Sequence, residues 1–435
     1  MQSGVMQQGA AFSRACLSRG KMSWATVAFF ALLILPFFEP RVLSVFVSDA
    51  FSVIYDCWRV LSAGLIAALY VVRAKKRAYD ALGVAVPLVI LCSTFLNAGL
   101  GSATDYFLWI GDWLPFFTGI LLVGYAREAK KKELIWALML VSSAISFANC
   151  LFVLMFPKGI PIGGLMGSVY FLGHKNVAIY AILPSVGMSF LIDGNRGRIC
   201  SPRTAVLFLM GLIQCMVAYS ATSIVAMGLF TLFALLSINR SARVKTTMLY
   251  GVVGYAAVFV SIVLLRLQNL AAPFIEGVLH KSTSFTLRTD VWDGVLSIMG
   301  GSPLLGYGLS LRGHLDFNGF AYAHPHNDLL SVPLSGGILA LALYVALIVL
   351  SATMLFRVRG QRTAGALSAM AVGFFAIALM EPLYTISWPL LLALCYAEGA
   401  ESRDGASQSA VFASNNMISE GISSALSRLS RFRVK

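Results

Sequence analysis

Two short segments of the chain place histidines where they could take part in proton transfer. His326 is followed by Asn327 and then by a long apolar stretch, so it stands at the start of a predicted helix. A neutral imidazole there can accept a proton from a hydroxyl group, and the positive end of the helix dipole favours an anion nearby. His174, followed by Lys175 and Asn176, stands in the same way before another apolar stretch. The two segments together predict a site that binds an anionic substrate and moves a proton.

An arginine on a short helix could complete such a site. Residues 284–299 carry an apolar stripe at helical spacing, and Ser302-Pro303 ends the pattern. Arg288 lies near the start of this helix, one turn before Trp292, and the helix should lie along the membrane surface. A guanidinium beside two helix amino ends is a suitable receptor for a pyrophosphate. The following Gly306-x-Gly308 is too short for a dinucleotide-binding loop.

The elements that must position these residues are transmembrane helices. The chain has 435 residues, of which 58% are hydrophobic and 12% charged, whereas a soluble chain has about a quarter charged residues. Its apolar blocks are roughly as long as a helix that crosses the hydrocarbon core, and they lack the alternation of barrel strands. The sequence therefore predicts an all-α, polytopic membrane protein. Twelve spans are expected, at 24–39, 58–72, 82–98, 106–125, 134–156, 176–192, 204–220, 222–238, 247–265, 328–355, 364–380 and 383–398.

The distribution of basic residues predicts the orientation of these spans. Alternate connections, together with both termini, hold 25 of the 33 lysines and arginines, and the other side holds eight. The positive-inside rule makes the first side cytoplasmic, so both termini are expected inside and all five histidines outside, on an inner-membrane protein. The net charge of +14 is then a consequence of topology and does not indicate nucleic-acid binding. The basic start and first apolar stretch are interpreted as a retained span, since no signal-peptide cleavage site follows.

The chain is expected to contain one transmembrane domain, 1–400, and a cytoplasmic tail, 401–435. The outer loop 267–327 is the predicted catalytic loop. The tail is expected to be disordered at first and then to form a basic amphipathic helix on the anionic inner leaflet, with simple disorder as the alternative. The seven cysteines form no C-x-x-C pair, so neither a disulfide framework nor a zinc site is predicted. Charged residues at the outer span ends (Asp56, Arg59 and Asp112) are expected to pair locally.

The outer loop resembles the O-antigen ligase and O-antigen polymerase family of membrane glycosyltransferases. The shared signature is an Arg and a Trp, then Pro-x-x-Gly-x-Gly, then His-Asn opening a span; the ligase form adds nine residues, Gly, two residues, Gly. In this chain the motifs read Arg288, Trp292, Pro303-Leu304-Leu305-Gly306-Tyr307-Gly308, His326-Asn327, Gly337 and, in place of the last glycine, Ala340. With Gly173-His174-Lys175-Asn176, the resemblance covers about 172–342. One departure concerns a Ser followed by Arg or Lys in many members, because here Ser223 is followed by Ile224.

The resemblance implies a donor in which an oligosaccharide is attached to a polyprenyl pyrophosphate. Arg288 and His326 are then the catalytic residues: Arg288 neutralises the leaving pyrophosphate, and His326 accepts the proton of the acceptor hydroxyl or orients it. Substrate binding is assigned to His174, Lys175, Asn176, Asn327 and Arg312. Lys175, Arg312 and Lys281 are the candidates to replace the cation missing at position 224. No cofactor or essential metal is expected, and His280, His314 and His324 are interpreted as solvated side chains.

The expected activity is polymerisation of exo- or capsular polysaccharide or of O-antigen repeats, outside the inner membrane. The alternative is a ligase that transfers the glycan to a lipid A core or another acceptor. A transporter of lipid-linked oligosaccharides is the rival from a different class, but such a protein should carry ionisable residues near mid-membrane, and these spans are almost free of charge. The expected partners are the lipid bilayer, the lipid-linked glycan, and a chain-length regulator or a flippase; no nucleic acid is expected.

Overall fold

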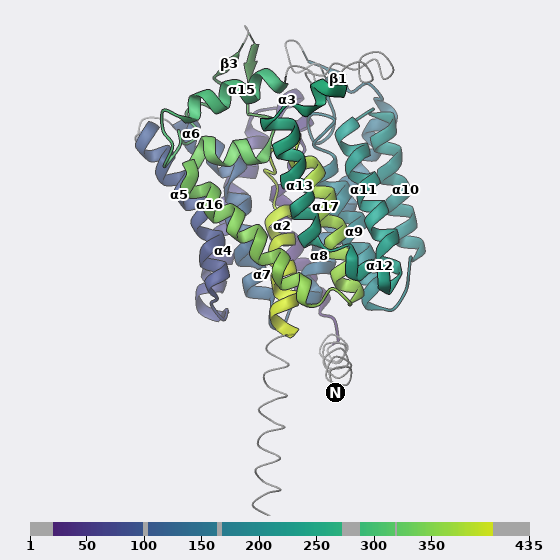
Figure 1. Cartoon of the computed structure of the whole chain (residues 1–435). Coiled ribbons are helices and arrows are strands. Elements are labelled where there is room, and N and C mark those ends of the chain that lie inside the picture. Colours follow the sequence, from purple (N-terminus) through teal and green to yellow (C-terminus); the bar gives the residue numbers. More distant parts are fainter. Residues whose placement is uncertain (1–20, 99–102, 163–167, 272–287, 318–319, 403–435) are drawn as a thin grey trace, which may run out of the picture.

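The fold is built almost entirely from helices, with two small hairpins on the same side of the bundle (Figure 1). The computed structural model describes residues 21–98, 103–162, 168–271, 288–317 and 320–402. The helices are α2 Trp24–Ile34, α3 Arg41–Phe46, α4 Ala50–Arg73, α5 Ala78–Ala98, α6 Ala103–Asp112, α7 Leu114–Ala126, α8 Lys131–Met155, α9 Ile179–Asn195, α10 Pro202–Val217, α11 Ala221–Ile238, α12 Arg240–Lys245, α13 Met248–Val258, α15 Arg288–Met299, α16 Asp328–Arg357 and α17 Arg362–Ala378, with a last helix over 387–402. Short helical turns η1 Leu35–Phe37, η3 Phe259–Leu264 and η4 Leu267–Ala271, and the antiparallel pairs β1 Ile160–Pro161 with β2 Ser168–Val169 and β3 Leu315–Phe317 with β4 Phe320–Tyr322, complete the described elements.

The predicted all-α, multi-pass class is confirmed. Within the described residues, five helices are long and apolar enough to cross a membrane, namely α4, α5, α8, α11 and α16. A sixth span results if α6 and α7, which meet at an angle of 41°, are counted as one broken helix. Each of the twelve predicted spans overlaps helix, but several of these helices are shorter than a full crossing. The number of crossings and the cytoplasmic position of the termini therefore stay predictions.

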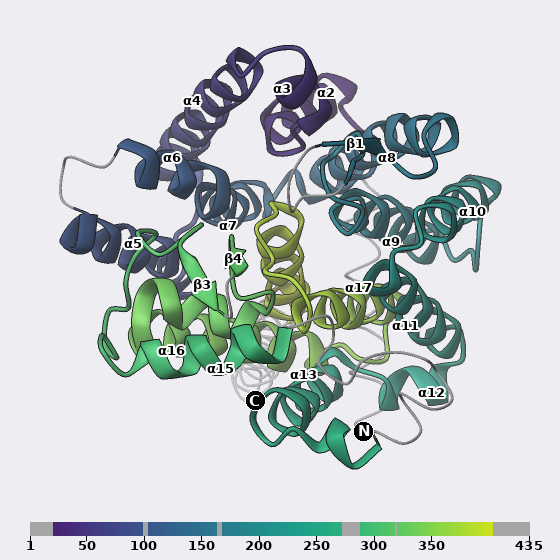
Figure 2. The same ribbon diagram turned by 90° about the horizontal axis from the view of Figure 1, so that it is seen from above.

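Helix α17 forms the centre of the bundle, because it is apolar and small on all of its faces. Every residue from Thr363 to Ala378 is buried, and none of these side chains is more than 9% exposed. It packs against α9, α11 and α13, and Figure 2 shows it surrounded by other helices. The outer helices instead turn large apolar side chains outward, for example Leu61 and Val72 of α4, which are 72% and 78% exposed. Contact between such apolar surfaces and lipid tails costs no free energy, whereas contact with water would be unfavourable.

Ion pairs hold several helix ends together at the end of the bundle opposite α15. Arg127, which caps α7, pairs with Asp80 in the first turn of α5 at 3.0 Å. Lys131, at the start of α8, pairs with Glu398 and Glu401 of the last helix at 2.9 Å and 2.6 Å. These ion pairs join the connection between α7 and α8 to the start of α5 and to the last helix.

At the other end, the predicted local pairing of outer charges is confirmed. Arg59 donates to Asp56 at 2.5 Å and to Glu39 at 2.8 Å, and both its guanidinium and Glu39 are buried. Asp112 pairs with Arg312. Each charge of this group has an opposite charge beside it, which lowers the cost of placing it at a span end.

Helix α16 is broken at Gly337, and the Pro-x-x-Gly-x-Gly segment binds the break. Gly337 has φ 63° and ψ −167°, a conformation open in practice only to glycine. The backbone groups freed by the break are paired with residues 303–308: Tyr307 and Gly308 donate to Leu334 and Ser335 at 2.8 Å and 3.0 Å, and Ile338 donates to Pro303 at 2.9 Å. The motif thus supplies the hydrogen bonds that the interrupted helix loses, and Figure 1 shows the two parts of α16 at an angle to each other.

Replacing Gly337 with alanine should destabilise the protein by more than the cost of backbone conformation alone. A Cβ at Gly337 would overlap the carbonyl group of Leu304, in addition to adopting a positive φ. A matched control is Gly313→Ala, where φ is +79° but no atom lies within 4 Å of the added Cβ. We expect the control to cost about 1–2 kcal/mol and Gly337→Ala clearly more, as measured by thermal unfolding in detergent. Equal unfolding temperatures for the two variants would contradict the proposed role of the segment.

Candidate active site

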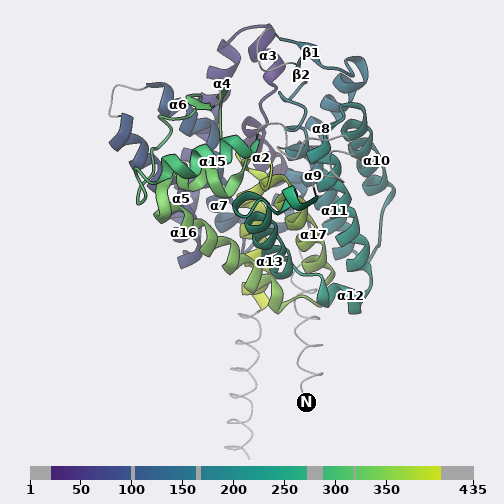
Figure 3. The same cartoon turned by 45° about the horizontal axis from the view of Figure 1, so that its top comes forward.

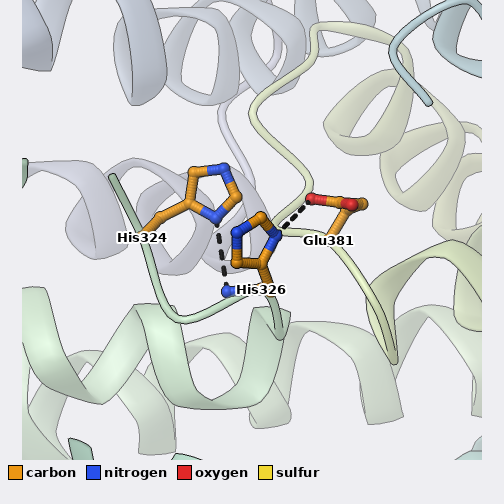
Figure 4. Close-up of side chains that lie close together, drawn as sticks. All are labelled: His324, His326 and Glu381. Atoms are coloured by element: carbon orange, nitrogen blue, oxygen red, sulfur yellow. Dashed lines mark hydrogen bonds and ion pairs between the residues drawn. The ribbon is translucent and has the colours of Figure 1, made fainter. Parts of the chain in front are cut away.

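A single carboxylate, Glu381, contacts each of the three segments that the sequence predicted to form the site. It lies in the loop between α17 and the last helix, and its side chain is 11% exposed. One oxygen, Oε1, accepts from Arg288 at 2.8 Å and from Asn176 at 2.8 Å, and the other, Oε2, lies 3.1 Å from Nδ1 of His326. Figure 4 shows Glu381 facing His326, with His324 on the other side of that ring. Asn176 and Arg288 are 112 positions apart in the chain, and both bind the carboxylate of Glu381.

Glu381 is not among the site residues predicted from the sequence. Its residue type and position did carry a signal, because a carboxylate followed by proline directly at the end of a predicted span is costly unless it has a partner. The sequence could not indicate which residues pair with Glu381. Of its three partners, His326 is the nearest along the chain, and it is 55 positions away.

Helix α15 carries Arg288 at its first position, and its buried stripe fixes the helix in place. The predicted helix 284–299 is confirmed from Arg288 onward, and 284–287 lie outside the described residues. Val291, Trp292 and Val295 are fully buried, and the Trp292 indole donates to the carbonyl group of Pro325 at 3.0 Å. This bond ties α15 to the residue just before His326. Figure 3 shows α15 lying over the start of α16.

Arg288 makes two directed contacts in this structure. Besides Glu381, its guanidinium donates to the carbonyl group of Met380 at 2.7 Å. The side chain stays 17% exposed, so an incoming group can reach it.

His326 is held in a conformation that is uncommon for a residue with a side chain. Its φ is +52°, and the next residue, Asn327, caps α16 by accepting from the amide of Leu330 at 3.2 Å. The Asn327 amide also donates to the carbonyl group of Leu379 at 3.1 Å. Asn327 is fully buried, and these two bonds fix the backbone beside His326; its predicted contact with substrate stays a prediction. A strained backbone kept by its surroundings is a frequent property of functional residues.

The charge state of Glu381 decides which nitrogen of His326 can act as a base. Burial alone would raise the pKa of Glu381, but the hydrogen bond from His326 and the charge of Arg288 outweigh burial and lower the pKa to about 2. An ionised carboxylate can only accept a hydrogen bond, so we assign the proton of neutral His326 to Nδ1, which faces Glu381. Nε2 is then left with a free lone pair, as in other carboxylate–histidine pairs.

The sequence suggested that His324 is a solvated side chain, but in the structure it lies close to the ring of His326. The two rings lie 4.3 Å apart, and Nδ1 of His324 accepts from the backbone amide of His326 at 3.3 Å. Burial lowers the pKa of His324 to about 3. His324 is therefore neutral near pH 7 and adds no competing charge to the site.

The segment before α9 reaches the same centre, as predicted. Asn176 donates to Glu381 and accepts from Ser220 at 2.9 Å, so it links the site to the start of α11. The Lys175 ammonium donates to the carbonyl group of Tyr219 at 3.3 Å, four positions from Ser223. His174 is exposed beside them, and its Nδ1 lies 3.5 Å from the amide of Asn176.

Arg312 lies near this centre but does not contact it. Its guanidinium pairs with Asp112 and stacks on the ring of Tyr384 at 4.7 Å. The Tyr384 ring in turn lies 6.3 Å from the ring of His324. His280 and Lys281 lie outside the described residues, and His314 is exposed.

Among the described residues, one group of three could hold a metal ion. His324, His326 and Glu381 bring ligand-type atoms within 4.8 Å of one another. Both oxygens of Glu381 already have partners, and Arg288 places a positive charge 2.8 Å from one of them. A cation there would have to displace Arg288, so the residues fit an ion poorly, and the absence of an essential metal stays a prediction.

A sequence profile of the O-antigen ligase family matches residues 205–345. This part of the chain is similar to an O-antigen ligase domain. This domain runs from α10 into α16 and contains Arg288 and His326, so the resemblance drawn from the motifs is confirmed. An O-antigen ligase domain indicates a glycosyl-transfer enzyme in a membrane. Glu381 and the 174–176 segment lie outside the match, and no curated protein matches the chain.

Glutamine in place of Glu381 should destabilise the protein at neutral pH and have little effect in strong acid. Since the folded-state pKa of Glu381 is lowered from 4.5 to about 2, its stabilising contribution is present above pH 4.5 and is lost as the pH falls toward 2. We expect roughly 3 kcal/mol at pH 7, as measured by thermal unfolding across pH. Asp316→Asn, at an exposed carboxylate of β3, is the control and should change little. A Glu381→Gln penalty that is the same at pH 7 and pH 2.5 would contradict the ionised state assigned here.

Proposed function

We propose that this protein transfers glycans from polyprenyl pyrophosphate donors on the outer face of the inner membrane. The observation that supports this most directly is the meeting of Arg288 and His326 on Glu381. No nucleotide sugar is supplied outside that membrane, so the donor must already be activated on a lipid. A cation for the pyrophosphate beside a base for the acceptor is the combination that such a transfer requires.

Arg288 serves the leaving group. As the acceptor oxygen bonds to the anomeric carbon, the bond from that carbon to the pyrophosphate oxygen breaks, and the lipid pyrophosphate leaves with the electron pair. Arg288 turns one or both of its contacts from Glu381 and Met380 to the phosphate oxygens and balances the charge that builds there.

His326 serves the acceptor. Its Nε2 takes the proton from the acceptor hydroxyl, and Glu381, at Nδ1, stabilises the imidazolium that forms. Glu381 is in this account a positioning residue that touches neither sugar. After transfer the proton leaves His326 to water, and the lipid pyrophosphate diffuses away in the bilayer.

Lys175 is the cation that we assign to the place of the missing family residue at 224. It reaches the junction of α10 and α11 through Tyr219, whereas Arg312 is occupied by Asp112 and Tyr384. His174 lies exposed beside it and can contact the glycan. Arg312 and Tyr384 border the His324 side of the site, where we place the acceptor sugar.

We favour polymerisation of repeat units, with Ile224 and the moderate length of the outer loop as the reasons. A chain-length regulator and a flippase are the proposed partners. A ligase would use the same chemistry and differ only in the acceptor.

The test is a reconstituted reaction. Purified protein in liposomes is supplied with a polyprenyl-pyrophosphate-linked repeat, with or without a lipid A core, in the presence and absence of EDTA. A ladder of longer lipid-linked products supports the polymerase, and transfer only to the core supports the ligase. Movement of the intact donor across the bilayer without any new glycosidic bond would overturn the proposal in favour of transport. Loss of turnover on adding EDTA would overturn the prediction that no metal is needed.

A further inference from the structure

Two pockets lie side by side at the end of the bundle opposite the candidate active site. The first is lined by the turn between α11 and α12 and by α12 itself, with Arg240 and Lys245. The second lies between the ends of α9 and α11 and the start of α17, with Arg198 and Arg362. The linings follow directly on each other in the chain, because Ile238 belongs to one and Asn239 to the other. Figure 1 places α12 at the bottom of the bundle, far from α15.

The two pockets carry positive charge that their own walls do not balance. Arg198, Arg240, Lys245 and Arg362 are exposed, and none of the described residues that line either pocket is acidic. Arg362 donates to the carbonyl group of Gly197 at 2.7 Å, which is a neutral group.

A fifth cation lies buried between the two pockets. Arg243 is 6% exposed and donates to the carbonyl groups of Ser237, Ile238 and Gly360. These bonds hold the end of α11 against the start of α17 and so keep the two pockets at a fixed spacing. They also leave the Arg243 charge without a carboxylate partner in these contacts.

Apolar surface continues from the pockets toward the middle of the bundle. On α11, Leu232 and Leu235 are 49% and 60% exposed, and Ile199 beside the second pocket is 54% exposed. Phosphate groups at the cationic pockets and hydrocarbon chains along this face would match a phospholipid in both chemistry and direction.

We propose that the two pockets together bind one phospholipid that carries two phosphates, cardiolipin, from the leaflet opposite the active site. Each phosphate contacts the cations that line one pocket, and the glycerol bridge crosses the turn between α11 and α12. Because the two phosphates are covalently linked, binding of the first raises the effective concentration of the second. A lipid with one phosphate lacks this advantage. The inference does not depend on the proposed glycan transfer.

The experiment compares lipids on the delipidated, full-length protein in detergent, by native mass spectrometry and by thermal shift. Cardiolipin should bind at least tenfold more tightly than phosphatidylglycerol at equal phosphate concentration, and phosphatidylcholine should bind weakest. Removing two cations from either pocket, by Arg198→Gln with Arg362→Gln or by Arg240→Gln with Lys245→Gln, should weaken cardiolipin binding by about thirtyfold. Each double variant should then bind cardiolipin no better than phosphatidylglycerol.

The matched control is Arg196→Gln, two positions from Arg198 but outside both pockets, where the guanidinium lies 5.4 Å above the Trp136 ring. It should leave the preference for cardiolipin unchanged. If loss of Arg362 unfolds the protein, the Arg240 and Lys245 pair provides the test alone. Equal binding of cardiolipin and phosphatidylglycerol to the unsubstituted protein, or loss of the preference in the control as well, would overturn the proposal.

Discussion

Alanine in place of His326 should reduce glycan transfer by about 10²–10⁴-fold, the usual contribution of a positioned general base. The fall should appear in kcat, because the imidazole acts on the acceptor proton in the transition state and not on the bound donor. The measurement is product formation in the reconstituted liposome reaction, with donor binding measured separately. The His326 side chain is 27% exposed, so removing it should leave the fold intact.

The control for this prediction is His314→Ala, at an exposed histidine near β3 that the structure places outside the Glu381 contacts. It should retain normal activity. Near-normal products from His326→Ala, with insertion and abundance unchanged, would exclude His326 as the base and with it the proposed mechanism.

Lysine in place of Arg288 should lower transfer by about 10²–10³-fold, comparable to the loss of one donor to a developing charge. Lysine keeps the positive charge but cannot make both of the directed bonds that Arg288 makes to Glu381 and Met380, nor the bidentate contact with the pyrophosphate that the proposed mechanism requires. Binding of a polyprenyl pyrophosphate, the released product, should weaken as well. Arg288→Ala should abolish activity in the same assay.

Arg266→Lys is the matched control, because Arg266 lies 5.3 Å from the Trp292 ring of the same helix and pairs with Asp293. Its replacement should leave transfer close to normal. An Arg288→Lys enzyme with unchanged kcat and unchanged product affinity would show that Arg288 has only a structural role.

The helices could be predicted from the sequence because their pattern is local. Apolar blocks and basic connections gave the positions of the spans, and the stripe of Val291 and Val295 gave helix α15. The motif contains Gly337, but the sequence did not show that the helix breaks there. The break depends on hydrogen bonds with residues 303–308, which are distant in the chain. Whether the shorter helices cross the membrane fully stays a prediction, because hydropathy counts apolar residues and not the length of the helix they form.

The site was predicted only in part, for a similar reason. Arg288, His326 and Asn176 were identified by type and by motif, and they do meet. The group that joins them, Glu381, was missed. In the structure Asn327 caps a helix and Arg312 pairs with Asp112, and their predicted substrate binding stays a prediction. Glu381 was missed because its contacts join distant segments, which neither spacing nor periodicity encodes.

The position of Glu381 has a consequence for chimeric enzymes. The loop with Arg288 and His326 belongs to the matched family region, but the carboxylate that orders both side chains is supplied from beyond its far end, and Asn176 from before its start. Exchanging only this loop between related transferases would move the reactive groups without the framework that aligns them. A functional graft should therefore require the recipient to provide an acid in the loop that corresponds to the one after α17.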